Sequence, residues 1–167
     1  MLCLLLLILG PPCKMFSTLM RMNRHMQGYD AAMDEAVQLL DFAMAPARAQ
    51  HNAKRCFVFE HPHNASSWRH SSVQELWQLP GVYDVVIHMC SLGLTCPFNG
   101  QPMQTRTRLL CNSYRFVQRV AMYQCACTVP HQSIQGSVGG AKLSTHAQQY
   151  APQFCKLLVA FAETLIA

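Results

Sequence analysis

Charged side chains are scarce in this chain of 167 residues. Only 13% of the residues are Asp, Glu, Lys or Arg, whereas about 25% is usual for a soluble domain. The formal net charge is +5, from 13 basic and 8 acidic residues, and no polybasic run is present. This charge is compatible with DNA as a partner but does not require it. A surface so poor in charge indicates contact with a protein partner or with a missing part of the same protein.

Long hydrophobic runs are missing too, because the apolar run at residues 1–9 is too short to span a bilayer. No positively charged residue precedes this run and no Ala-x-Ala-like site follows it, as a signal peptide would require. We therefore favour a buried strand of a parallel sheet, and a nuclear or cytoplasmic protein. The alternative is a signal peptide over residues 1–10, which would make the protein secreted.

The cysteines do not indicate a disulfide framework, although there are nine of them. The number is odd, and several lie inside apolar runs. This pattern is typical of buried thiols in a reducing compartment. A secreted cysteine-rich protein is the less favoured interpretation.

The apolar residues, about half of the chain, are sufficient for the core of one domain. Continuous apolar and β-branched segments predict strands at 1–9, 55–60, 82–89 and 105–112. Amphipathic segments predict helices that begin near residues 30, 72, 113 and 143, and Pro46 is expected to kink or end the first of them. The alternation predicts an α/β domain: a truncated, Rossmann-like, mostly parallel sheet of about four strands flanked by helices.

Cys13 follows the first predicted strand, directly after the turn formed by Pro11 and Pro12. The carboxyl edge of an open α/β sheet is where ligands bind. A helical turn after Cys13, and the positive charge of Lys14, would activate its thiol. The alternative is an ordinary cysteine in a turn.

Glu60 ends the second predicted strand and is followed by His61 and Pro62. Apolar neighbours would raise the pKa of Glu60 by desolvation, so that it holds a proton near neutral pH. A solvated acid at a strand end is the alternative. If the two strands are adjacent and parallel, they deliver a thiol and an acid into one cleft.

The order of these motifs resembles that of cytosine-5 DNA methyltransferases. Pro-Pro-Cys-x-x-Phe-Ser looks like their motif IV, and Glu-His-Pro looks like their Glu-Asn-Val motif VI. The chain is most similar to a divergent methyltransferase-like group of protist and algal genomes, often found near retrotransposon genes. The residues that match this group are Pro11, Pro12, Cys13, Phe16, Ser17, Glu60, His61, Pro62, Ala65, Ser67, Trp68, Cys90, Gly93, Thr107 and Asn112.

The resemblance implies a fragment or degenerate relative of an enzyme that transfers a methyl group from S-adenosylmethionine to carbon 5 of cytosine. Cys13 would attack carbon 6 of a base flipped out of DNA, and Glu60 would hydrogen-bond N3. No glycine-rich cofactor loop precedes Cys13. We therefore expect one partial domain over residues 1–167, without the cofactor-binding N-terminal half and inactive alone.

The stretch Gln104-Thr105-Arg106-Thr107-Arg108 fits Gln-x-Arg-x-Arg and resembles motif VIII of the same family. On a strand, Gln104, Arg106 and Arg108 share one face. The resemblance implies that these three residues and Pro12 bind the substrate. The alternative is an edge strand with a solvated basic face.

Cys125, Cys127 and His131 have the short spacing with which a zinc site can begin. A four-ligand site needs a further residue from outside this stretch. The sequence therefore predicts no metal centre, with these three residues as the candidates if one exists. The alternatives to a methyltransferase-like function are a non-catalytic interaction protein derived from a mobile element, and a small zinc-binding module.

Overall fold

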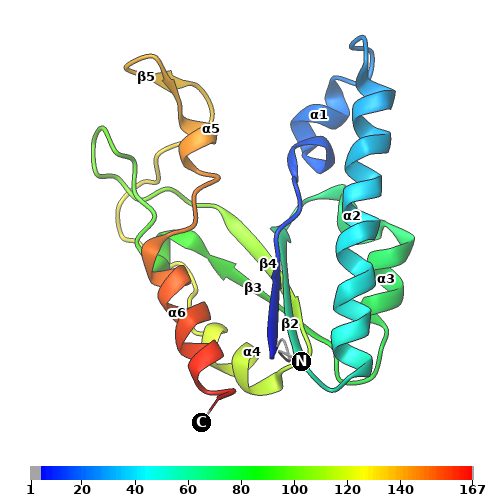
Figure 1. Ribbon diagram of the computed structural model, residues 1–167. Helices are drawn as coiled ribbons and strands as arrows, with labels where there is room; N and C mark the ends of the chain where they lie inside the picture. Colours follow the sequence, from blue (N-terminus) through cyan, green and yellow to red (C-terminus); the bar gives the residue numbers. More distant parts are fainter. Residues whose placement is uncertain (1–4, 167) are drawn as a thin grey trace.

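The protein is described here by a computed structural model, which covers residues 5–166 apart from the side chain of Leu19. A four-stranded sheet stands between two layers of helices (Figure 1). The strands are β1 (Leu6–Leu9), β2 (Cys56–Pro62), β3 (Tyr83–His88) and β4 (Arg106–Cys111). The four predicted strands are thus confirmed, except that residues 1–4 of the first lie outside the described residues.

The sheet has the order β1-β2-β4-β3 and is mixed. β1 is parallel to β2, whereas β4 is antiparallel to both of its neighbours. The prediction of a mostly parallel sheet is therefore wrong for the strand pairs, although β1, β2 and β3 share one direction. The reason lies in the connections, because parallel neighbours need a long crossover, usually a helix. Helices connect β1 to β2 and β2 to β3, but only a short 3-10 turn, η3 (Met89–Leu92), lies between β3 and β4.

One face of the sheet is covered by α2 (Tyr29–Asn52) and α3 (Ser71–Trp77) (Figure 1). Leu40 of α2 and Phe57 and Phe59 of β2 are fully buried between these layers. Burying side chains of this size contributes about 1.5–3 kcal/mol each. α2 continues through Pro46 to Asn52, so the proline does not end the helix.

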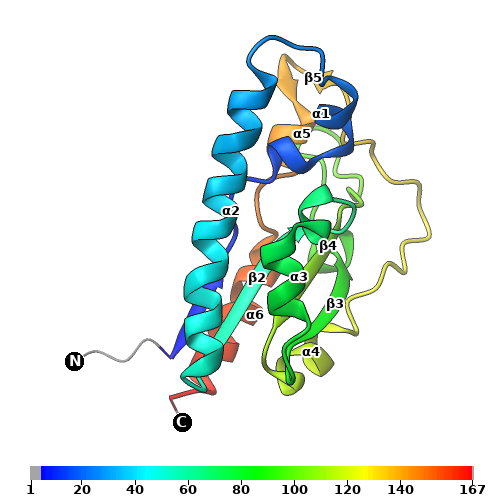
Figure 2. The same ribbon diagram turned by 90° about the vertical axis from the view of Figure 1, so that its right-hand side faces the viewer.

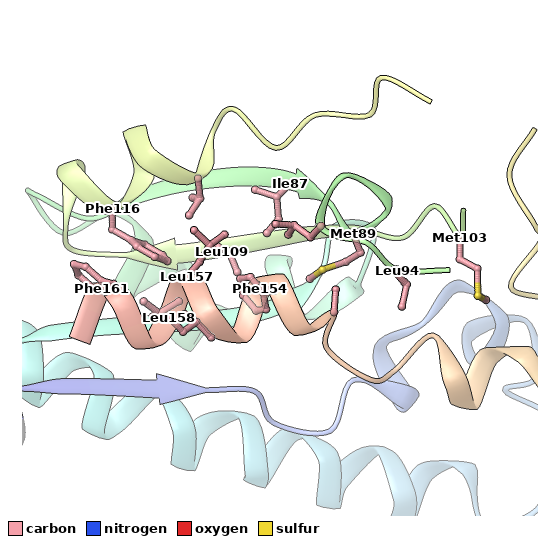
Figure 3. Packing of buried hydrophobic residues seen from close by; sticks show 14 of the residues in the cluster. Ile87, Met89, Leu94, Met103, Leu109, Phe116, Phe154, Leu157, Leu158 and Phe161 are labelled. Atoms are coloured by element: carbon pink, nitrogen blue, oxygen red, sulfur yellow. The ribbon is translucent and has the colours of Figure 1, made fainter. Parts of the chain in front are cut away.

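The opposite face is covered by α4 (Tyr114–Val120) and α6 (Pro152–Glu163). Figure 3 shows Phe154, Leu157 and Phe161 of α6 packed toward Leu109 of the sheet. The ring of Phe161 also stacks on Phe116 of α4, with 4.5 Å between the centroids. The predicted terminal helix from residue 143 is broken in two, because a short α5 (Leu143–His146) ends before Pro152 begins α6.

The remaining elements are short: η1 (Lys14–Phe16), α1 (Thr18–Met22), η2 (Ser66–Arg69) and the β5 (Ser137–Val138) and β6 (Ala141–Lys142) hairpin. Figure 2 shows a long irregular loop that leaves α4 and climbs beside the sheet to β5. The helices among the described residues include none that is long and apolar enough to cross a membrane.

Candidate functional site

The ends of β1 and β2 bring Cys13 and Glu60 together. The parallel register pairs Leu9 with Phe59, so Gly10 and Glu60 follow side by side at the same edge of the sheet. A Cβ atom placed on Gly10 would lie 3.8 Å from Oε2 of Glu60. Cys13 lies close enough for the Glu60 charge to raise the pKa of its thiol. The predicted meeting of thiol and acid is therefore present in the fold.

The side chain of His61, on strand β2, is hydrogen-bonded to the loop that contains Cys13. Its ring is 1% exposed, with Nε2 3.0 Å from the carbonyl oxygen of Pro11 and Nδ1 2.6 Å from the hydroxyl of Ser67. A carbonyl only accepts hydrogen bonds, so Nε2 carries the proton and Nδ1 accepts from Ser67. Burial lowers the pKa of His61 to about 4. The ring is therefore neutral at neutral pH.

The carboxylate of Glu60 is held by two hydroxyl groups. Tyr150 donates a hydrogen bond of 2.6 Å to Oε2, and the side chain of Thr107 supplies a second one. Burial raises the pKa of Glu60, and the two hydrogen bonds offset only part of this rise. The direction of the predicted shift, and desolvation as its cause, are confirmed.

Tyr150 is a member of this site that the sequence did not indicate. It lies between α5 and α6, is 40% exposed, and packs edge-on against Phe154. Burial and the Glu60 charge raise its pKa, so the hydroxyl keeps its proton and donates. A Cβ atom on Gly10 would lie only 2.6 Å from this hydroxyl. Glycine at position 10 therefore permits the approach of Tyr150.

The thiol of Cys13 is not activated in this structure. Burial first, and then the charge of Glu60, raise its pKa, and a hydrogen bond with its own backbone offsets part of the rise. Lys14 is exposed, and the expected lowering of the Cys13 pKa by its charge is wrong. Cys13 is therefore a protonated thiol at neutral pH, and it becomes a nucleophile only when its proton is removed.

Two of the predicted substrate-binding residues, Arg106 and Arg108, lie on the other face of the sheet from Glu60. The register pairs Arg108 with His61, and pairs Glu60 with Leu109, and side chains alternate between faces along a strand. Arg108 lies over the ring of Trp77, with 4.8 Å to its centroid. The alternation instead turns Thr107 toward Glu60.

The other two predicted substrate-binding residues, Gln104 and Pro12, are both exposed. Pro12 directly precedes Cys13 in the site. The side chain of Gln104, however, is hydrogen-bonded to Cys125. Gln104 also precedes the first residue of β4, so it does not continue the face of Arg106 and Arg108 as expected.

Cys125, Cys127 and His131 form a second cluster, which is completed by Cys90. The four potential ligand atoms all lie within 4.8 Å of one another. Sequence spacing gave three of these residues, and the fold adds the fourth from the turn after β3. The sequence predicted no metal centre because a fourth ligand was missing, and Cys90 now supplies that fourth potential ligand.

The described residues do not fit S-adenosylmethionine. The strands β1, β2 and β3 end at one edge of the sheet, and they are followed by Gly-Pro-Pro, His-Asn-Ala and Met-Cys-Ser. None of these is a glycine-rich turn of the kind that cradles a nucleotide cofactor. A cavity of about 330 Å³ is lined by Pro97, Phe98, Ala141, Lys142, Thr145, His146 and Gln149, and this lining contains no acidic residue.

Comparison with known proteins finds no matching family model, no matching curated protein and no matching solved structure. The two features to explain are the Cys13–Glu60 site and the cluster around Cys90.

Proposed function

We propose that the chain is part of a divergent protein of the cytosine-5 DNA methyltransferase type, with Cys13 and Glu60 as an inherited nucleophile and acid. The observation that carries the proposal is the convergence of these two groups at the ends of parallel strands β1 and β2. The upward shift of the Glu60 pKa supports it, because the shift favours the protonated form that can donate a proton.

The chemistry that this pair supports is addition of a thiol to a pyrimidine ring. The proton of Cys13 leaves to solvent, and its sulfur forms a bond to carbon 6 of cytosine. The electron pair of the carbon 5–carbon 6 double bond forms a double bond between carbon 4 and carbon 5. The electron pair of the carbon 4–N3 double bond moves to N3, which takes the proton of Glu60. The adduct is electron-rich at carbon 5, the position at which a methyl group would be accepted.

Entry of a base requires a change at Glu60, because Tyr150 already donates to its Oε2 atom. The ring would have to displace the Tyr150 hydroxyl. Among the predicted substrate-binding residues, Pro12 and Arg106 are exposed at the same edge of the sheet. We keep these two as contacts for the nucleic acid, whereas Arg108 is already engaged by Trp77 and by Asp84, 3.7 Å away.

The proposal requires a methyl-donor site outside the described residues, since these residues do not fit the methyl donor. β1 is an outer strand of the sheet, and Leu5 and Ile8 beside this edge are 41% and 45% exposed. An outer strand with apolar side chains is a place where another strand can pair. We therefore expect thiol addition, but no methyl transfer, from the chain alone.

The test is covalent capture of a single-stranded oligonucleotide in which one cytosine is replaced by 2-pyrimidinone. This base adds thiols at carbon 6 without a methyl donor, and a single strand needs no base flipping. We expect one adduct per chain by intact mass, located on Cys13 by peptide mapping and absent from Cys13→Ser. The control Cys155→Ser removes an exposed cysteine that is close enough to affect Tyr150 but has no role in the proposed addition, and it should react like the wild type. Failure to form an adduct, or an adduct on another cysteine, would contradict the proposal.

A second candidate is a non-catalytic interaction protein, and the outer position of β1 favours it. In that case the protein should form a dimer or a complex through this edge while Cys13 stays unreactive. Light scattering that shows a monomer over a wide concentration range would count against self-association.

A further inference from the structure

Four side chains from two separate segments converge beyond the end of β3. Cys90 belongs to η3, and Cys125, Cys127 and His131 lie on the loop between α4 and β5. Their three sulfur atoms and one ring nitrogen lie within 4.8 Å of one another, and Cys125 Sγ is 3.4 Å from His131 Nε2. In tetrahedral zinc sites with bonds of about 2.0–2.3 Å, neighbouring ligand atoms are separated by about 3.5–3.8 Å. Small side-chain movements would therefore bring all four atoms to zinc distance.

We propose that Cys90, Cys125, Cys127 and His131 bind one zinc ion. Three cysteine sulfurs and one histidine nitrogen are an established ligand set for structural zinc. Four protein ligands complete the tetrahedron and leave no position for water or substrate. The ion would therefore hold the fold together and take no part in the reaction proposed for Cys13 and Glu60.

The ligands are already placed by hydrogen bonds around them. The backbone N–H of Cys125 donates to Nδ1 of His88 over 2.9 Å, and the side-chain amide of Gln124 donates to the carbonyl of Val86 over 2.9 Å. After His131, the backbone N–H of Gln132 donates to the carbonyl of Pro102 over 2.9 Å. Both ends of the ligand-bearing stretch are thus attached to β3 and to the segment before β4. Such attachments orient ligands before the metal binds.

Three cysteine sulfur atoms lie within 4.8 Å of one another in this cluster. Three thiolates at this separation would repel one another unless a cation lay between them. A divalent ion would provide that positive charge and displace protons from the thiols. Zinc binding to the metal-free protein should therefore release protons.

A zinc ion here would also explain how the long loop is held. Residues 121–136 contain no helix and no strand, and long irregular loops are uncommon in compact domains unless they serve a function. Among the residues described in this loop, the apolar contacts with the core come mainly from Tyr123 and Ile134. One ion would join the middle of the loop to η3 and thus to the sheet.

The test uses the full chain, purified without chelators, and measures zinc by elemental analysis. We expect one zinc per chain. After removal of the metal, Co²⁺ should give the intense visible bands of a tetrahedral site and a thiolate-to-cobalt charge-transfer band. Cys127→Ser should weaken binding by more than about 100-fold, whereas the control Cys155→Ser should bind like the wild type.

His131→Cys guards against loss of folding as an explanation, because it keeps four zinc-binding side chains. This variant should bind one zinc ion and give a stronger charge-transfer band, with an unchanged circular dichroism spectrum. Wild-type protein that carries no zinc and gives no thiolate–cobalt band would overturn the proposal. Equal affinity of Cys127→Ser and wild type would overturn it as well. Neither result depends on the reactivity of Cys13.

Discussion

Lowering the pH should destabilise the fold through one buried side chain, the imidazole of His61. The neutral ring satisfies both of its nitrogens, one with the carbonyl of Pro11 and the other with the hydroxyl of Ser67. It also packs against Phe59, with 5.1 Å between ring centroids. A proton on Nδ1 would place a positive charge in this apolar surrounding, which is why the pKa falls to about 4.

The magnitude follows from the difference between folded and unfolded pKa values. The unfolded imidazole has a pKa of about 6.5 and the folded one of about 4. A lowered folded pKa means that the unfolded chain takes up the proton first, so stability is lost as the pH falls. The loss should reach about 2 kcal/mol at pH 5 and about 3 kcal/mol at pH 4, relative to pH 7.

Urea unfolding of wild type and His61→Asn, followed by tryptophan fluorescence, measures this loss. Trp68 lies edge-on to His61 with 6.4 Å between the rings, and therefore reports on the site. The stability advantage of wild type over the variant, which cannot titrate at position 61, should shrink by about 3 kcal/mol between pH 7 and pH 4. A constant difference, or a His61 imidazole that titrates near 6.5 by NMR, would refute the reasoning.

Three further predictions concern Glu60, its partner Tyr150 and the arginines. Because burial raises the pKa of Glu60, the free energy of unfolding should fall as the pH rises from the unfolded pKa of about 4.3 through the raised folded pKa. Glu60→Gln should abolish this component in urea unfolding measured at increasing pH. Tyr150→Phe removes a hydrogen bond to Oε2 of Glu60, so it should raise the Glu60 pKa, measured by NMR, and lower stability by about 1 kcal/mol. Gly10→Ala should have the same two effects, because its methyl group would meet the Tyr150 hydroxyl. An unchanged Glu60 pKa in both variants would count against the contact. Arg108→Leu should lower the free energy of unfolding by about 1 kcal/mol, because Arg108 loses its contacts with aromatic rings. Arg106 is exposed, so Arg106→Leu should change this free energy by less than about 0.5 kcal/mol. Equal effects of the two substitutions would contradict the placement of these side chains.

The strands of this fold could be predicted from local sequence, but their arrangement could not. The run at 55–60 coincides with β2, an inner strand whose side chains are mostly buried on both faces. The run at 82–89 coincides with β3, an outer strand rich in β-branched residues. The reversal of β4 depends on the connection after β3, which contains no helix beyond the short η3. Parallel neighbours need a long crossover connection, whereas a loop without a long helix favours an antiparallel strand.

The site was predictable where it depends on neighbouring strand ends. Cys13 and Glu60 each follow a strand of the same direction, and the parallel pairing of β1 with β2 brings them together. Tyr150 is 90 positions from Glu60 in sequence, and no periodic pattern connects the two. Cys90 matched the motif order of the resemblance, but only the fold shows that it completes the cluster with His131.

The central claim is that Glu60 protonates a pyrimidine while Cys13 adds to it, and the rate of capture by the 2-pyrimidinone oligonucleotide tests this most directly. Loss of a positioned acid typically lowers a rate by about 10²–10⁴-fold. Glu60→Gln, with Cys13 intact and the fold checked by circular dichroism, should therefore form the Cys13 adduct at least about 100-fold more slowly than wild type. Capture of Cys13 at the same rate in both proteins would contradict the account.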